Sequence, residues 1–185
     1  MSITSVRPSN RRRIRIPLVL AAACSAAAAL ALAPTAQAVT PTTATATYDC
    51  GAWGSGLATL TATDSGTSKS IKLTSTDIKM PPGTAADPNS ITTTLKLTKT
   101  SGGVTSQVQF SGKANPGMAY PSPLITLGPL KLTSGTLAAG DTTNSLVLSG
   151  PPSATNWSLQ IVTSSPTSAT VPCVATGNQS APFVW

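Results

Sequence analysis

The chain has 185 residues, of which twelve are lysine or arginine and five are acidic, and its formal net charge is +7. It contains no histidine, and all five acidic residues are aspartates. A Ser-His-Asp triad, a Cys-His pair and a histidine metal site are therefore excluded.

The N-terminus has the three parts of a secretory signal peptide. Five arginines fall within residues 1–15, and an uncharged apolar run follows over residues 17–33. Ala36 and Ala38 supply the small side chains that signal peptidase requires at the −3 and −1 positions. We therefore predict cleavage after Ala38, so that a secreted, extracellular protein begins at Val39.

Two alternatives for residues 1–38 stay open. The apolar run approaches the length that spans a bilayer, so an uncleaved anchor is one of them. Lipidation at Cys24 is the other, although the residues after this cysteine are apolar rather than a polar tether. With cleavage after Ala38, no stable membrane anchor remains.

Cleavage would also change the charge of the protein. All five arginines leave with the signal peptide, and seven lysines then face five aspartates, for a net charge of +2. The lysines are scattered along the sequence without a basic cluster, so nucleic acid is not an expected partner.

Residues 39–44 are expected to be a short leader, and residues 45–185 a single domain. Within this domain apolar and polar residues alternate in short runs that turn residues separate, which is typical of strands with one solvated face. The residues expected to point inward on the clearest runs are Ala58, Leu60, Ala62, Ile71, Leu73, Ile91, Leu95, Leu97, Val104, Val108 and Phe110.

About nine short strands at this spacing predict an all-β fold. We expect an antiparallel β-sandwich of the immunoglobulin-like, Greek-key type. A closed barrel is the alternative, because the same alternation occurs in both architectures.

The two cysteines that remain after cleavage, Cys50 and Cys173, are expected to form a disulfide. Tyr48 and Cys50 share one strand face, and Val171 and Cys173 share another, so both sulfurs can point into the core. A cysteine nucleophile would need a base such as histidine, which the chain lacks.

The stretches "YDCGAWGSGLATLTAT", "SGKANPG" and "GPLKLTSGTLAAGD" resemble a group of small secreted proteins of actinobacteria. In these domains of unknown function an early and a late cysteine bracket a strand-rich region. The resemblance implies export and a β-fold. It lends no catalytic residue, cofactor or ligand site.

The remaining chemistry would have to come from aspartates or lysines. Asp64 in "ATDSGTS" resembles the aspartic-protease turn, but that mechanism needs two such aspartates at close range and there is no second copy. A hairpin turn is the expected role of this stretch. We expect no catalytic residue, no metal site and no cofactor.

The aromatic residues are the candidate ligand contacts. Trp53, Tyr120 and Trp185 lie near glycine or proline or at a chain end, and exposed aromatic faces on β-proteins can stack on sugar rings. Trp157 shares its parity with Leu159 and is expected in the core.

The sequence therefore predicts a secreted, non-enzymatic binding or structural module. Its partner would be polysaccharide or cell wall, contacted through exposed aromatics, or alternatively an extracellular protein bound at a sheet edge. A hydrolase with an unusual aspartate or Ser–Lys site is the minor alternative.

Overall fold

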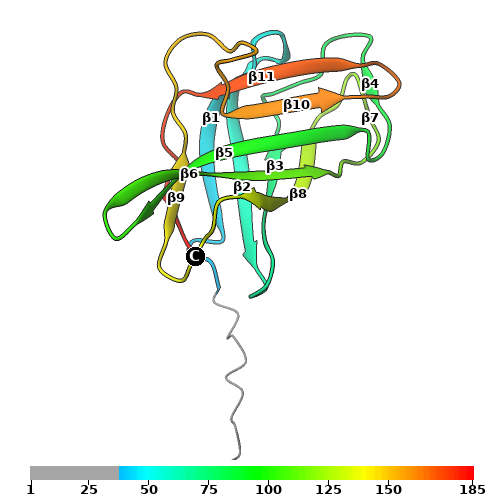
Figure 1. Cartoon of the computed structure of the whole chain (residues 1–185). Helices are drawn as coiled ribbons and strands as arrows, with labels where there is room; N and C mark the ends of the chain where they lie inside the picture. Colours follow the sequence, from blue (N-terminus) through cyan, green and yellow to red (C-terminus); the bar gives the residue numbers. More distant parts are fainter. Residues whose placement is uncertain (1–37) are drawn as a thin grey trace, which may run out of the picture. The chain divides into compact units, whose positions relative to one another are not determined.

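The computed structural model describes residues 38–185, which Figure 1 shows as a strand-rich domain. No helix within these residues is long and apolar enough to cross a bilayer. Of the residues predicted to flank the signal cleavage site, Ala36 lies outside the described part and Ala38 is exposed. The elements are β1 (Thr43–Asp49), the 3-10 turn η1 (Gly51–Trp53), β2 (Ser55–Asp64), β3 (Lys69–Ser75), β4 (Ala85–Ala86), β5 (Ile91–Ser101), β6 (Val104–Lys113), β7 (Met118–Ala119), β8 (Ile125–Ser134), β9 (Thr142–Ser145), β10 (Leu159–Thr163), β11 (Ala169–Ala175) and β12 (Phe183–Val184).

Eight antiparallel strands close into a barrel in the order β10-β11-β1-β2-β3-β8-β6-β5. Closure comes from β10, which pairs with β11 on one side and with β5 on the other, from Leu159 opposite Leu95 to Thr163 opposite Ile91. The predicted all-β, antiparallel fold is thus confirmed. The architecture is one sheet that closes on itself, the alternative given above, rather than two packed sheets.

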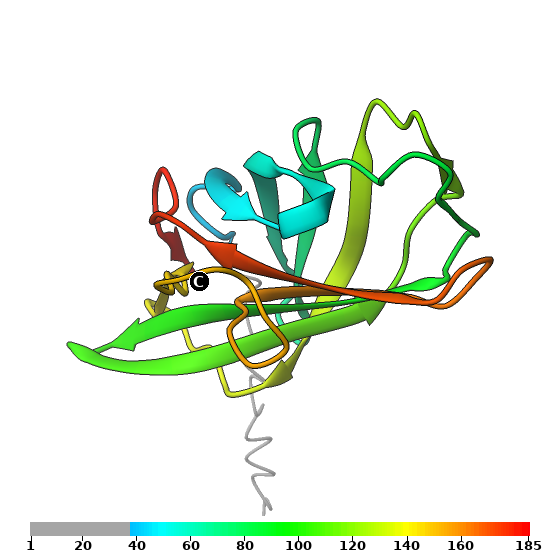
Figure 2. The same cartoon turned by 90° about the horizontal axis from the view of Figure 1, so that it is seen from above.

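Strand β5 is long enough to change its partner along its length. Its first half pairs with β10, and Leu97–Thr100 pair with β9, which in turn pairs with β12. Beyond the barrel the β5–β6 hairpin continues to its tip at Gly102 and Gly103, and Figure 2 shows it projecting past the other strands.

The segment predicted to be a leader packs onto the domain. Val39 is buried, and the backbone N–H of Thr40 donates to the carbonyl of Val184 at 3.0 Å. In return the N–H of Val184 donates to the carbonyl of Thr40 at 2.8 Å. Residues 39–42 therefore continue the folded domain ahead of β1.

The barrel is filled by the residues that the alternation placed inward. All but one of the residues expected to point inward on the clearest runs are buried. The exception is Val104, which is 70% exposed because the first residues of β6 lie in the projecting hairpin, where no second layer covers them. The alternation correctly predicts which residues point into the barrel. It does not show where a strand extends beyond the barrel, as β6 does.

A bulge in β8 separates its two halves, and small residues make it fit. Gly128 has φ +97°, and a Cβ there would lie 2.9 Å from the carbonyl oxygen of Ile71. On the next strand a Cβ at Gly112 would lie 2.9 Å from the carbonyl oxygen of Pro129. Strands β3 and β6 can thus approach the bulge closely only with glycine at these two positions.

A buried ion pair stabilises the end of the barrel near β9. The carboxylate of Asp141 accepts a hydrogen bond from the backbone N–H of Ala138 at 2.8 Å and lies 2.8 Å from the ammonium of Lys99. The Ala138 N–H, the Lys99 ammonium and the Ser101 hydroxyl together lower the pKa of Asp141 to about 2. Folding therefore favours the ionised carboxylate.

This pKa predicts an acid-dependent loss of stability. Because the folded pKa lies below the unfolded one, the stabilisation is complete above about pH 4 and is lost as the pH falls toward 2. Replacing Asp141 with asparagine should lower the free energy of unfolding by about 2 kcal/mol at neutral pH. Urea unfolding of both proteins should show this difference shrinking toward pH 2, and a difference that stays constant with pH would contradict it.

Candidate functional site

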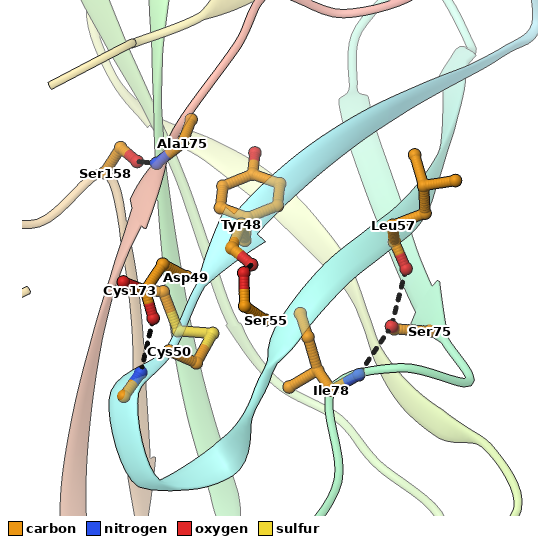
Figure 3. Close-up of a disulfide and its surroundings, with 11 residues drawn as sticks. Tyr48, Asp49, Cys50, Ser55, Leu57, Ser75, Ile78, Ser158, Cys173 and Ala175 are labelled. Carbon is orange, nitrogen blue, oxygen red and sulfur yellow. Dashed lines mark hydrogen bonds between the residues drawn. A yellow bond between two sulfur atoms is a disulfide. The ribbon is translucent and has the colours of Figure 1, made fainter.

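The disulfide joins Cys50, between β1 and η1, to Cys173 in β11, as expected. Both cysteines are buried, and Figure 3 shows the bond between the two strand ends. Beside it the carboxylate of Asp49 accepts from the N–H of Gly51 at 2.9 Å, and the hydroxyl of Ser158 accepts from the N–H of Ala175 at 2.7 Å. This end of the barrel is a fixed support for the loops around it.

The buried Ser75 connects the loop after β3 to β2 through hydrogen bonds. The hydroxyl of Ser75 donates to the carbonyl of Leu57 at 2.6 Å and accepts from the N–H of Ile78 at 3.0 Å (Figure 3). At the next residue, the N–H of Lys79 donates to the carbonyl of Trp53 at 2.7 Å. The backbone that carries Lys79 is therefore held in place.

Two of the three candidate ligand-contact aromatics are not exposed. Trp53 is 5% and Trp185 2% exposed. Trp185 stacks on Phe110 with ring centroids 5.6 Å apart, and its indole N–H donates to the hydroxyl of Thr143 at 2.9 Å. Both tryptophans are core residues, so the prediction that they contact a ligand through exposed faces is corrected.

Tyr120 is the exception, because 48% of it is exposed. It follows the short strand β7, which pairs with β4, and its backbone N–H donates to the carbonyl of Thr84 at 3.1 Å. The buried side chain of Asn115 holds the preceding loop by donating to the carbonyl of Asp87 and accepting from the N–H of Ile91, both at 2.8 Å. The ring is thus presented by an anchored loop.

A hollow of about 430 Å³ lies at this tyrosine. The residues that line it are Tyr120, Pro121 and Pro123 together with Lys79 and Ser122. Lys79 forms no ion pair within residues 38–185. We refer to this surface as the Tyr120 hollow; it combines an aromatic residue and two prolines with one lysine and one serine.

Two further hollows are formed by the described residues. One, of about 380 Å³, lies beside the disulfide and is lined by Trp53, Pro152, Pro172 and their neighbours, without a charged group. The other, of about 330 Å³, is lined by hydroxyl and glycine residues together with Lys69 and Lys131. No aspartate lines any of the three hollows.

Trp157 is only partly buried, although we expected it in the core. The ammonium of Lys96 lies 3.3 Å from the centroid of its ring, a cation–π contact. Burial lowers the pKa of this lysine. Sequence spacing could not show this contact, because the two residues are 61 positions apart and meet only through the pairing of β5 with β10.

The aspartates hold turns and pair with lysines. Asp64 and Asp141 pair with Lys69 and Lys99. The other three, Asp49, Asp77 and Asp87, accept hydrogen bonds from Gly51, Leu57 and Ser165 respectively. Asp64, in the Asp-Ser-Gly stretch, also accepts from the N–H of Gly66 in the turn between β2 and β3. Among residues 38–185 no group of three histidine, cysteine or acidic side chains could hold a metal ion.

Comparison with family models, with curated proteins and with solved structures finds no match to this chain.

Proposed function

We propose that this protein is an exported, non-enzymatic module that binds polysaccharide or cell wall at the cell exterior through the Tyr120 hollow. The observation that carries the proposal is an aromatic ring, 48% exposed, in a hollow with two prolines, a lysine and a serine. An apolar face with a few polar groups at its side is the usual composition of a small-ligand site, and a sugar ring can stack on such a face.

Export is supported by two independent features. Residues 1–38 have the sequence pattern of a secretory signal peptide. The Cys50–Cys173 disulfide is of the kind that forms and persists in oxidising compartments. A binding rather than a catalytic role is supported by the aspartates, because each is engaged in a turn or an ion pair and none lines a hollow.

Truncating the tyrosine tests the proposal. The protein starting at Val39 should co-sediment with at least one of insoluble cell wall, chitin and cellulose, and Tyr120→Ala should weaken binding about tenfold or more. Loss of one stacked aromatic removes about 0.5–1.5 kcal/mol in addition to the apolar area that it buries, and about 1.4 kcal/mol corresponds to a tenfold change in affinity. Sedimentation isotherms over a range of polymer concentrations measure this change.

Leu57→Ala is the matched control. Leu57 is 54% exposed on β2, so this variant also removes an exposed apolar side chain, but away from the Tyr120 hollow. Tyr120→Phe should keep most of the affinity if stacking dominates. Equal effects of Tyr120→Ala and Leu57→Ala, or no binding to any of the three polymers, would contradict the proposal.

A free sheet edge favours an extracellular protein partner as the second candidate. Strand β8 pairs with β6 only from Gln109 to Ser111, so residues 104–107 have no strand partner on that side, and all four are exposed. This edge contains no proline and no charge, the two devices that usually block strand addition. A strand from a partner protein could pair with this edge. If the protein binds none of the three polymers, this edge is the next surface to test for a protein partner.

A further inference from the structure

The lysines of the barrel fall into two classes according to the side of the sheet from which they project. Lys69 and Lys99 share the parity of the buried residues Ile71 and Leu97, and each pairs with an aspartate. The lysines of opposite parity point outward, and none of them forms an ion pair within the described residues: Lys72, Lys96, Lys113 and Lys131.

The four outward lysines lie on four consecutive strands, β3, β8, β6 and β5. Lys131 on β8 stands opposite Ser70 on β3 and Ser111 on β6. Lys72 and Lys113 each lie two residues beyond these serines in the same direction, so both flank Lys131 diagonally, Lys72 at the position where the register with β8 shifts. We call this outward surface the lysine face.

The lysine face has no acidic residue to compensate it. The four strands contain none, since all five aspartates lie in β1, in β2 or in loops. Like charges on neighbouring strands repel, and here no counter-charge reduces that repulsion. The net charge of +2 expected after export is therefore distributed unevenly, and a large part of the positive charge faces one side.

Hydroxyl and amide side chains fill the positions between the lysines. Ser111 hydrogen-bonds to Thr94 across the β5–β6 pair at 3.0 Å, and Gln109 stands opposite Lys96. At one end of the face Lys131 also lines the hollow of about 330 Å³, together with Ser68 and other hydroxyl residues. The surface thus alternates cations with groups that both donate and accept hydrogen bonds.

We propose that the lysine face binds an anionic polysaccharide, a function that goes beyond the binding proposed for the Tyr120 hollow. Lysine ammoniums at this spacing complement carboxylates or other anions that recur along a chain, and the serines, threonines and glutamine complement the sugar hydroxyls between them. Single-stranded nucleic acid fits less well, because within residues 38–185 the one ring in a cation–π contact with these lysines is Trp157, and the Lys96 ammonium already lies over it.

The test is binding of the protein that starts at Val39 to polygalacturonate, with dextran as the neutral counterpart. Polygalacturonate should bind, dextran should bind much more weakly at the lysine face, and the affinity should fall by roughly tenfold or more between about 50 and about 300 mM NaCl. Lys131→Gln should weaken binding about fivefold, and the triple variant K72Q/K113Q/K131Q roughly 100-fold.

Asn178→Asp is the matched control for net charge. It lowers the charge by one unit, as Lys131→Gln does, but Asn178 is exposed in the loop between β11 and β12, on the other side of the strand order. It should change the affinity less than twofold. The triple variant should unfold cooperatively near the temperature of the unsubstituted protein, which checks that it is folded, and polygalacturonate should raise the unfolding temperature of the unsubstituted protein alone.

Three outcomes would overturn the proposal. The first is no salt-sensitive binding of polygalacturonate, and the second is an equal loss of affinity in Lys131→Gln and Asn178→Asp. The third is binding of duplex DNA or phosphatidylglycerol vesicles as tight as that of polygalacturonate, which would show recognition of charge alone. The Tyr120 hollow is tested with Tyr120→Ala and this face with K72Q/K113Q/K131Q, and the two sets of residues do not overlap, so failure of one proposal does not decide the other.

Discussion

Replacing both Cys50 and Cys173 with alanine is expected to lower the free energy of unfolding by about 4–5 kcal/mol. The two residues are 123 positions apart, and a cross-link over so long a loop removes much of the conformational entropy of the unfolded chain. In the folded state it ties the end of β1 to β11, whose direct pairing with β1 is limited to Tyr48 and Asp49. Urea unfolding of the oxidised protein and of the double variant measures the difference.

Reduction of the unsubstituted protein provides the control. Both sulfurs are buried, so alanine substitution also removes packing atoms, whereas reduction keeps them and breaks only the bond. The reduced protein and the double variant should therefore show similar losses, with the variant slightly less stable. An unfolding midpoint that does not change on reduction would contradict the expectation.

The strands could be predicted from the sequence because the physical cause is local. Alternation along "ITTTLKLT" buries Leu95 and Leu97 whatever the strand pairs with. Closure of the sheet has a different cause, the pairing of β10 with β5, in which Leu159 lies opposite Leu95, 64 positions away in the sequence. No pattern within either strand distinguishes a paired edge from a free one, so sandwich and barrel could not be separated.

The candidate site could be predicted only in part. Tyr120 in "AYPSP" is exposed because prolines on either side of Ser122 keep that loop out of the sheet, a local signal. Trp185 was misjudged although a signal existed, since it shares the parity of Phe183, which is also buried. A neighbouring glycine or a position at the chain end predicts exposure of a tryptophan less reliably than alternation predicts its burial.

The lysine face could not be predicted from the sequence, because its residues come together only in the folded sheet. Lys72, Lys113 and Lys131 are scattered along the chain and form no charge run. Only the order β3-β8-β6 and the register of its strands bring them to one surface. Their assignment depends on non-local pairing, which composition and spacing do not contain.

Trp185→Ala is expected to lower the free energy of unfolding by about 3–5 kcal/mol, the range for removing a large buried aromatic. The indole fills the barrel end beside β12, where it contacts Phe110 and Phe183, and the ammonium of Lys69 lies 5.5 Å from its ring. Its N–H also satisfies the buried hydroxyl of Thr143. Truncation would therefore leave a cavity and an unpaired buried polar group together.

Two companion variants separate these causes. Trp185→Phe keeps most of the apolar volume but loses the hydrogen bond to Thr143, so a smaller loss of about 1–2 kcal/mol is expected. Val184→Ala changes the preceding residue, which is 40% exposed, and should stay within about 0.5 kcal/mol of the unsubstituted protein. If Trp185→Ala were no more destabilising than Val184→Ala, the indole would not be part of the core. Phe110 and Phe183 would then have to cover the barrel end by themselves.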